Sequence, residues 1–349
     1  MKLLIITQKV DKNDDILGFF HNWLLEFSKR CEKLTVICLQ KGEYDLPENV
    51  KVFSLGKEEG ELRIKYVLNF WKYIWQERKN YDSVFVHMNP EYVVLGGLFW
   101  RLIGKKISLW YTHKSVDLKL KIAEKFSNII FTVSKESFRM KTNKLKVVGH
   151  GIPVEKFKNQ GNLVYKKDAV LKIISVGRIT PIKNLDTLIN ACEILKKNGL
   201  NFAVSLIGPV VDEKDRKYFE YLKQLISEKD LDKEIKFLGS IPNNKLAEFY
   251  WQNDFSINLC PTGGVDKAIL ESMASGLITL ASNIAFEEYF GEYKEDLMFK
   301  EKDEKDLAAK IMKLISTDDL VRIKNFLLSS VKEKTDLDKL LLRIINEIK

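Results

Sequence analysis

The sequence predicts an α/β protein of two Rossmann-like domains, each with a doubly wound parallel sheet, and three observations support this prediction. The chain has 349 residues, more than one ordinary core needs and enough for two. Short apolar runs rich in β-branched residues alternate with helical patterns, as in βαβ units. The alternation stops once, at the polar residues 155–168, and then restarts, which predicts a boundary between two domains.

The first alternation predicts a domain over residues 1–154. Helices are expected at residues 19–30 and 62–78, where apolar side chains recur at helical spacing. The expected strands are residues 1–7, 34–39, 51–55, 83–87, 106–111 and 128–133. All are short and apolar, which is typical of the buried strands of a parallel sheet.

The second alternation predicts a domain over residues 169–330, after a linker at 155–168. The expected strands are residues 171–176, 202–207, 235–238, 255–259 and 278–281. The expected helices are residues 184–198, 212–229, 244–252, 267–276, 306–314 and 319–333. A last segment, residues 331–349, is expected to form a helix that packs back toward the first domain. Because open α/β sheets bind ligands at the carboxyl ends of their strands, the sites should lie there.

Composition narrows the class of protein. Hydrophobic residues make up 45% of the chain and charged residues 30%, which is ordinary for a globular protein. The apolar residues 1–7 are followed at once by charges, so they predict a buried strand rather than a leader peptide. No uncharged apolar run reaches the length of a membrane span. The four cysteines lack C-x-x-C spacing, which favours reduced thiols in a cytoplasmic protein.

The formal net charge of +9 is concentrated in the N-terminal half, where residues 1–155 hold 26 Lys and Arg against 18 Asp and Glu. This imbalance indicates an anionic partner: a membrane surface, a phosphorylated acceptor or nucleic acid. The alternative is a lysine-rich surface that serves only solubility. No nucleic-acid-binding module is present in the sequence, so nucleic acid is not an expected partner.

The predicted helix at residues 62–78 combines five aromatic side chains with four cations. Such a helix suits the membrane interface and a lipid-linked acceptor. The other reading is a core helix with a charged outer face. The first reading predicts a peripheral protein on the inner face of the membrane.

The first motif that predicts chemistry begins where an apolar strand ends at Gly177. Arg178 follows directly, and Lys183 lies five residues further on, where a helix begins. A glycine allows a tight turn out of the strand, and two cations near a helix N-terminus suit a diphosphate. The alternative is a pair of surface cations.

A second motif follows the strand at residues 255–259. The pair Gly263–Gly264 opens a helix, and its backbone N–H groups suit an anion or a sugar hydroxyl. Glu271 lies about one turn into that helix. A carboxylate there can accept both hydroxyls of a ribose, although a helix dipole also favours an acid near its N-terminus.

The run V-G-R-I-T-P-I-K-N-L-D-T-L-I, residues 176–189, resembles the start of the C-terminal domain of family 4 retaining glycosyltransferases, which have the GT-B fold. The resemblance is strong from Gly177 to Gly276 and weak in the N-terminal half. It implies two Rossmann-like domains facing across a cleft, and a UDP- or GDP-sugar as donor substrate. It also implies that Arg178 and Lys183 bind the donor diphosphate, and that neither a cofactor nor a metal is needed.

The segment ending in L-E-S-M-A-S-G is similar to the E-x₇-E region of that family. Glu271 matches the second glutamate, whereas the first, which touches the donor sugar, falls at Gly263 and is absent. We expect Asp266, in the same loop, to supply the missing carboxylate. Backbone N–H groups of Gly263, Gly264 and Val265 are expected to complete the sugar site.

Four weaker matches complete the expected site. Gly18 resembles the family's loop glycine near the donor phosphates or acceptor, and His113 resembles its histidine at a strand end that contacts the donor sugar. Ser240 and Ile241 match the loop against the nucleobase. The alternative interpretations are a simple turn at Gly18 and a structural histidine at position 113. His87, at another strand end, is a further candidate, and His21 and His150 are less favoured.

The expected reaction is transfer of a hexose from the nucleotide-sugar to a hydroxyl of a glycan or lipid-linked acceptor, with retention of configuration. The absence of the first glutamate keeps a second class open, a catalytically impaired scaffold that acts as a binding or partner subunit. A sugar-nucleotide epimerase is a further alternative, and the chain is short for a glycan phosphorylase. A dehydrogenase is not expected, because no G-x-G-x-x-G follows the first strand.

Overall fold

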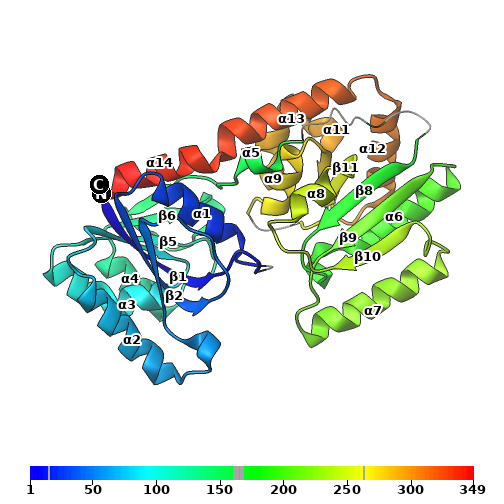
Figure 1. Ribbon diagram of the computed structural model, residues 1–349. Helices are drawn as coiled ribbons and strands as arrows, with labels where there is room; N and C mark the ends of the chain where they lie inside the picture. The colour runs from blue at the N-terminus through cyan, green and yellow to red at the C-terminus, as the bar shows by residue number, and fades with distance from the viewer. Residues whose placement is uncertain (15, 160–164, 166–168, 262–263) are drawn as a thin grey trace. The chain divides into compact units, whose positions relative to one another are not determined.

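The computed structural model describes residues 1–14, 16–159, 165, 169–261 and 264–349. These residues form two compact units (Figure 1). The first unit comprises residues 1–151, 242–244 and 337–349, and the second comprises residues 152–241 and 245–336. Residues 160–164 and 166–168, most of the predicted linker, lie outside the described part of the chain. The beginning of that segment forms the short helix α5, Val154–Phe157.

The first unit is a parallel sheet covered by helices on both faces. Within its described residues the sheet has seven strands, in the order β3-β2-β1-β4-β5-β6-β7. Their bounds are β1 Lys2–Val10, β2 Lys33–Lys41, β3 Val50–Ser54, β4 Ser83–His87, β5 Lys106–Trp110, β6 Ile129–Thr132 and β7 Leu145–Val147. The strand order reverses between β1 and β4, and open α/β sheets bind ligands at such a reversal.

Alternate residues of β1 belong to different cores, as the two-residue period of a strand requires. Leu3 and Ile5 pack with α1 (Phe19–Ser28) and α14 (Leu337–Ile348), which also contact each other. Leu4 and Ile6 pack with the helices on the opposite face, namely α2 (Arg63–Gln76), α3 (Pro90–Leu102) and α4 (Leu118–Phe126). The C-terminal helix therefore belongs to the first unit, opposite α2, α3 and α4 (Figure 1).

The second unit repeats this architecture with a smaller parallel sheet. Its described residues give five strands in the order β10-β9-β8-β11-β12, and the order reverses between β8 and β11. The strand bounds are β8 Leu171–Val176, β9 Phe202–Ile207, β10 Ile235–Gly239, β11 Phe255–Asn258 and β12 Ile278–Ala281. The longer helices are α6 Leu185–Lys197, α7 Glu213–Glu228, α8 Leu246–Tyr250, α9 Lys267–Ala274, α12 Glu304–Ser316 and α13 Leu320–Thr335. Short helical turns, including α10 (Glu287–Phe290) and α11 (Lys294–Leu297), follow β12.

The observed elements confirm the predicted alternation of strands and helices. The strands at residues 83–87, 171–176, 202–207 and 278–281 have the expected bounds, and the other predicted strands differ by a few residues at their ends. The pattern missed β7, which has three residues, as well as α5. Both are too short for a hydrophobic period to appear, and they form because the neighbouring β6 and α9 offer a surface to pack against.

Candidate functional site

The candidate site lies in the second unit, where the strand order reverses between β8 and β11. Parallel strands end at the same edge of a sheet, and the helices that follow these two strands leave in opposite directions. Gly177 and Arg178 follow β8 directly, and Asn258 ends β11. A small pocket at this edge is lined by both groups, together with Lys183. The sequence-predicted cations therefore lie where this class of sheet binds ligands.

Three successive strands on one side of this reversal run into a glycine with positive φ. Gly177 follows β8 with φ 152°, Gly208 follows β9 with φ 154°, and Gly239 ends β10 with φ 73°. The Gly177 N–H donates to the Ile207 carbonyl at 2.9 Å, and the Gly208 N–H donates to the Gly239 carbonyl at 2.9 Å. Residues that carry a side chain rarely adopt these backbone conformations. The two hydrogen bonds thus link the ends of β8, β9 and β10. We call Gly177, Gly208 and Gly239 the bonded edge.

Gly208 makes the closest approach in this edge, and the sequence interpretation did not include it. A Cβ at position 208 would lie 1.9 Å from the Gly177 carbonyl oxygen, well inside van der Waals contact. No side chain therefore fits without moving the turn that carries Arg178. The signal in the sequence is a glycine directly after a buried strand, in L-I-G-P-V.

Arg178 is held by a buried acid. Its Nε lies 3.1 Å from Asp215 Oδ2, and the Arg178 side chain is 48% exposed while that of Asp215 is fully buried. Burial would raise the pKa of Asp215, but hydrogen bonds, including one from the Val211 N–H at 3.3 Å, and the Arg178 guanidinium keep it below its usual value. A buried carboxylate thus orients the guanidinium, and Arg178 Nη2 lies 4.0 Å from Asp212 Oδ2.

Lys183 ends a short 3₁₀ turn, Pro181–Lys183, before α6. A Cβ on Gly177 would lie 3.3 Å from Lys183 Cε, so the lysine side chain passes beside this glycine. Its ammonium forms an ion pair with Asp266. Burial lowers the pKa of Lys183, but Asp266 outweighs it and leaves the pKa above the usual value. Lys183 is therefore positively charged, and Asp266 holds its ammonium group in place.

Asp266 links the lysine to the start of α9. It is the N-cap of that helix, and its Oδ1 accepts from the Ala268 N–H at 3.3 Å. Its Oδ2 accepts from Asn258 Nδ2 at 3.0 Å in addition to Lys183. Burial would raise the pKa of Asp266, but Lys183 and Asn258 hold it below its usual value. Asp266 was expected to contact the donor sugar, but both of its carboxylate oxygens accept hydrogen bonds from other groups of the protein.

Asn258 was missed by the sequence interpretation. It is buried at the end of β11, bonds to Asp266, and accepts from the Cys260 N–H through Oδ1 at 3.1 Å. Its signal is a polar residue at the carboxyl end of an otherwise apolar strand, F-S-I-N. It fixes the loop between β11 and α9 at both ends.

Glu271 is buried one turn into α9, as predicted, with 4% of its surface exposed. The Tyr250 hydroxyl lies 3.5 Å from Glu271 Oε2 and 3.1 Å from the Ala268 carbonyl oxygen. Burial lowers the pKa of Lys267 to about 7, although Glu271 and Asp266 favour its charged form. Lys156 on α5 also has a pKa below its usual value because of burial, which Glu271 opposes. Glu271 therefore interacts electrostatically with two lysines whose charged forms burial disfavours.

The remaining predicted residues of the second unit are less enclosed. Gly264 and Val265 are half-buried before α9, and the Gly264 carbonyl lies 3.5 Å from Asn283 Nδ2. Ser240 is exposed after β10, and Ile241 packs partly against the core. Gly263, the position of the absent glutamate, lies outside the described residues.

Two predicted residues, Gly18 and His113, belong to the first unit. Gly18 is the N-cap of α1, its N–H donates to the Asp14 carbonyl at 3.0 Å, and a Cβ there would lie 2.5 Å from that oxygen. His113 follows β5 by three residues, is exposed, and accepts from the Ser115 N–H through Nδ1 at 3.2 Å. The close packing of Gly18 against Asp14 therefore explains why a glycine occupies this position of the loop.

The other histidine candidate, His87, is buried at the reversal point of the first sheet. Its Nδ1 lies 3.4 Å from Thr7 Oγ1, and its ring stacks on Phe20 with centroids 4.1 Å apart. His21 is also buried, and its Nε2 accepts from the Asp45 N–H at 3.1 Å. Both histidines are packed into the first unit.

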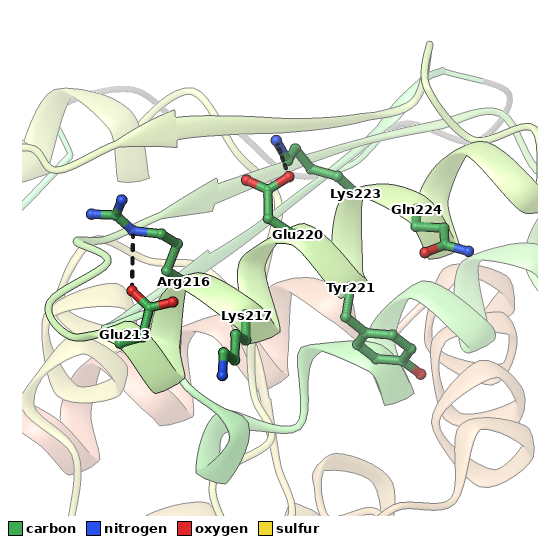
Figure 2. Close-up of a pocket in the computed structure, with 7 residues that line it drawn as sticks. All are labelled: Glu213, Arg216, Lys217, Glu220, Tyr221, Lys223 and Gln224. Carbon is green, nitrogen blue, oxygen red and sulfur yellow. Dashed lines mark ion pairs between the residues drawn. The ribbon is translucent and has the colours of Figure 1, made fainter.

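A shallow hollow lies along the outer face of α7, and Figure 2 shows its lining residues on this one helix. Its charges pair with one another: Lys223 Nζ lies 2.6 Å from Glu220 Oε2, and Arg216 Nε lies 4.0 Å from Glu213 Oε2. Pairs of this kind are typical of a solvated helix surface. In the described part of the chain, no helix has the length and apolar character that a membrane span requires.

Comparison with known proteins links the second unit to a family. Residues 155–324 match the model of Glycosyl transferases group 1. The amylovoran biosynthesis glycosyltransferase AmsK of Erwinia amylovora is 32% identical over 148 residues, which are 40% of this chain and 34% of AmsK. A GDP-Man:Man(3)GlcNAc(2)-PP-Dol alpha-1,2-mannosyltransferase of Eremothecium gossypii is 34% identical over 25% of this chain and 15% of its own. The chain thus spans about a third or less of these two relatives.

The fold extends the likeness to the whole chain. HepE of Anabaena, solved in complex with UDP, superimposes with a TM-score of 0.76 over 100% of this chain and 99% of HepE, at 15% identity. The same protein was also solved with UDP-glucose. Two parallel sheets that match such structures confirm the predicted fold class, α/β with the GT-B architecture.

Proposed function

We propose that the protein is a nucleotide-sugar-dependent glycosyltransferase of the family 4 retaining type, which transfers a hexose to a hydroxyl of a glycan or lipid-linked acceptor. The observation that carries the proposal is the position of Arg178 and Lys183 at the β8–β11 reversal, within the residues that match Glycosyl transferases group 1. Two cations beside a tight glycine turn suit a diphosphate. The donor is a UDP- or GDP-sugar, a choice supported by the names of the relatives and by UDP in HepE.

In this proposal Arg178 and Lys183 stabilise the leaving nucleoside diphosphate. Negative charge develops on the diphosphate as the glycosidic bond breaks, and preorganised cations then bind the transition state better than the substrate. The support is that both side chains are fixed before the donor arrives, Arg178 by Asp215 and Lys183 by Asp266.

Glu271 binds the ribose hydroxyls, and Ser240 and Ile241 lie against the nucleobase. A buried carboxylate can accept hydrogen bonds from two hydroxyls. In this proposal the backbone N–H groups of Gly263, Gly264 and Val265 bind the donor sugar. Two observations support these assignments. Glu271 is buried, and it matches the second glutamate of the family's E-x₇-E region.

Asp266 acts in this proposal as the residue that positions Lys183. Its oxygens already accept from Lys183, Asn258 and the Ala268 N–H, which favours this role over direct contact with the donor sugar. In the first unit, the proposal assigns Gly18 and His113 to the donor and acceptor side, supported by their places after β1 and β5.

Retention follows if the acceptor hydroxyl attacks the face from which the diphosphate leaves, with a donor phosphate oxygen taking the acceptor proton. The bond from the sugar to the diphosphate breaks as the bond to the acceptor oxygen forms. No divalent metal is required, because the two cations neutralise the diphosphate. The proposed setting is glycoconjugate or polysaccharide synthesis at the cytoplasmic face of a membrane.

Calorimetric titration with UDP, GDP and ADP, on the wild type and on Arg178→Ala and Glu271→Ala, tests the donor site. One nucleotide should bind the wild type and bind both variants at least about tenfold more weakly, which is the loss of one charge-assisted hydrogen bond. Absence of binding by every nucleotide would contradict the proposal. Nucleotide binding without any sugar transfer would instead favour a binding scaffold, in line with Gly263 at the first glutamate position.

A further inference from the structure

Helix α2 has two apolar stripes, and only one of them is used by the fold. The first packs into the core of the first unit through Phe70 and Ile74, which are fully buried. The second faces outward with a helical spacing of four, three and four residues. It consists of Ile64, Leu68, Trp71 and Trp75, which are 63%, 61%, 40% and 56% exposed. A helix on the surface of a globular protein ordinarily has a single apolar stripe.

Helix α3 extends this exposed stripe. Leu98 and Leu102, one turn apart, are 59% and 77% exposed. The Phe99 ring joins the two helices, since its centroid lies 6.0 Å from Trp71 and 5.8 Å from Trp75. We call the exposed set Ile64, Leu68, Trp71, Trp75, Leu98 and Leu102 the α2–α3 apolar face. Clustered exposed apolar residues, unlike scattered ones, mark an interaction site.

The charges around this face are nearly all positive. Residues 62–76 contain Arg63, Lys65 and Lys72 but no Asp or Glu. The Arg78 guanidinium carbon lies 4.3 Å from the centre of the Trp75 ring, and Arg101 is exposed on α3. Lys65 pairs with Glu61, just before the helix. An indole with a cation stacked on it suits a surface that is apolar on one side and anionic on the other.

We propose that the α2–α3 apolar face docks on a lipid bilayer that contains anionic lipids. Leucine and tryptophan side chains would enter the headgroup and acyl boundary, while the flanking arginines and lysines meet lipid phosphates. Charge complementarity favours this occupant over a second copy of the chain. A two-fold contact on this face would set the same cations against one another. The face belongs to the first unit, so this inference does not depend on the donor site in the second.

The inference deepens the proposed function in one respect, because a docked enzyme would meet lipid-linked acceptors at the membrane surface. The two proposals nevertheless fail separately. Vesicle binding is measured without nucleotide, and nucleotide binding is measured without vesicles.

Cosedimentation of the full chain tests the docking face, with vesicles of phosphatidylcholine alone or mixed with phosphatidylglycerol. The wild type should bind the mixed vesicles about tenfold or more tightly than the neutral ones, and added salt should weaken the binding. The Leu68→Gln/Leu102→Gln variant should lose about tenfold in affinity. Both leucines are largely exposed, so the folded unit should tolerate the change, which the thermal midpoint checks. Leu342→Gln on α14, at a half-exposed leucine of the same unit, is the matched control and should bind as the wild type.

The vesicle experiment has two outcomes that would overturn the inference. Equal binding of neutral and anionic vesicles, or none of either, would remove an anionic bilayer as the occupant. Concentration-dependent dimerisation in sedimentation velocity that is abolished by Leu68→Gln/Leu102→Gln would assign the face to a second copy of the chain instead.

Discussion

Lys183 and Asp266 form an ion pair that joins the turn after β8 to the N-terminus of α9. The two residues are 83 positions apart in the chain. The pair brings together the second cation of one motif and the acid that the sequence interpretation assigned to the other. Asp266 therefore has two structural tasks, to cap a helix and to fix an ammonium at the candidate diphosphate site.

The first prediction separates these two tasks. Asp266→Asn keeps a good N-cap but removes the negative charge beside Lys183. The affinity for the nucleoside diphosphate should stay the same or increase, because the site becomes more positive, whereas kcat should fall about tenfold as Lys183 loses its position. Calorimetry and steady-state kinetics measure the two quantities. Asp303→Asn at the N-cap of α12 is the matched control, and a parallel loss of affinity and kcat in Asp266→Asn would argue for direct donor contact.

The second prediction concerns Arg178, whose guanidinium is held by the buried Asp215. Arg178→Ala should weaken nucleotide binding by about tenfold to a hundredfold, the range of one or two charge-assisted hydrogen bonds. It should also lower the thermal midpoint, because Asp215 loses a partner in a buried place. Arg216→Ala, an exposed arginine on the outer face of α7 (Figure 2), should change neither quantity. Equal nucleotide affinity in both variants would remove Arg178 from the donor site.

The third prediction tests the bonded edge of strand ends. Gly208→Ala places a Cβ 1.9 Å from the Gly177 carbonyl oxygen, so the turn that carries Arg178 must move. We expect a loss of about 3 kcal/mol or more in the free energy of unfolding. Gly199→Ala also has positive φ, but nothing lies within 4 Å of its Cβ, so it should cost only about 1 kcal/mol. Urea unfolding compares the two variants, and similar losses would show that the contact at Gly208 relaxes easily.

Hydrophobic periodicity predicted most of the fold, because each long helix and buried strand carries its own period. Gly177 and Arg178 directly follow a predicted strand, so their placement at a strand end was accessible from sequence, whereas the strand order that reverses between β8 and β11 was not predicted. The roles of Asn258 and Gly208 were not accessible. They depend on contacts with residues that are distant in the chain or on a neighbouring strand, and no local pattern records such a contact.

Asp266 and α2 also show which features the sequence predicts and which depend on tertiary contacts. A carboxylate in a loop before a helix is visible in the sequence, but its pairing with Lys183 is a tertiary contact. In α2 the aromatic residues and cations were visible, whereas the separation into a buried and an exposed stripe depends on which side α3 and the sheet cover. The sequence therefore supplied the residue types, and packing decided which atoms are left for a ligand.

The last prediction concerns the pH dependence of stability. Burial lowers the pKa of Lys267 from 10.5 to about 7 in the folded protein. Between these two values the unfolded chain binds more protons at this lysine than the folded chain does, so its contribution makes stability rise with pH from about 7 to about 10.5. Lys267→Met should remove that rise, which urea unfolding at about pH 7 and about pH 9 would measure as a smaller gain than in the wild type. The exposed Lys217→Met should keep the wild-type gain. If Lys267→Met kept it as well, Lys267 would remain charged in the folded protein, and Glu271 beside it would then compensate the cost of burial.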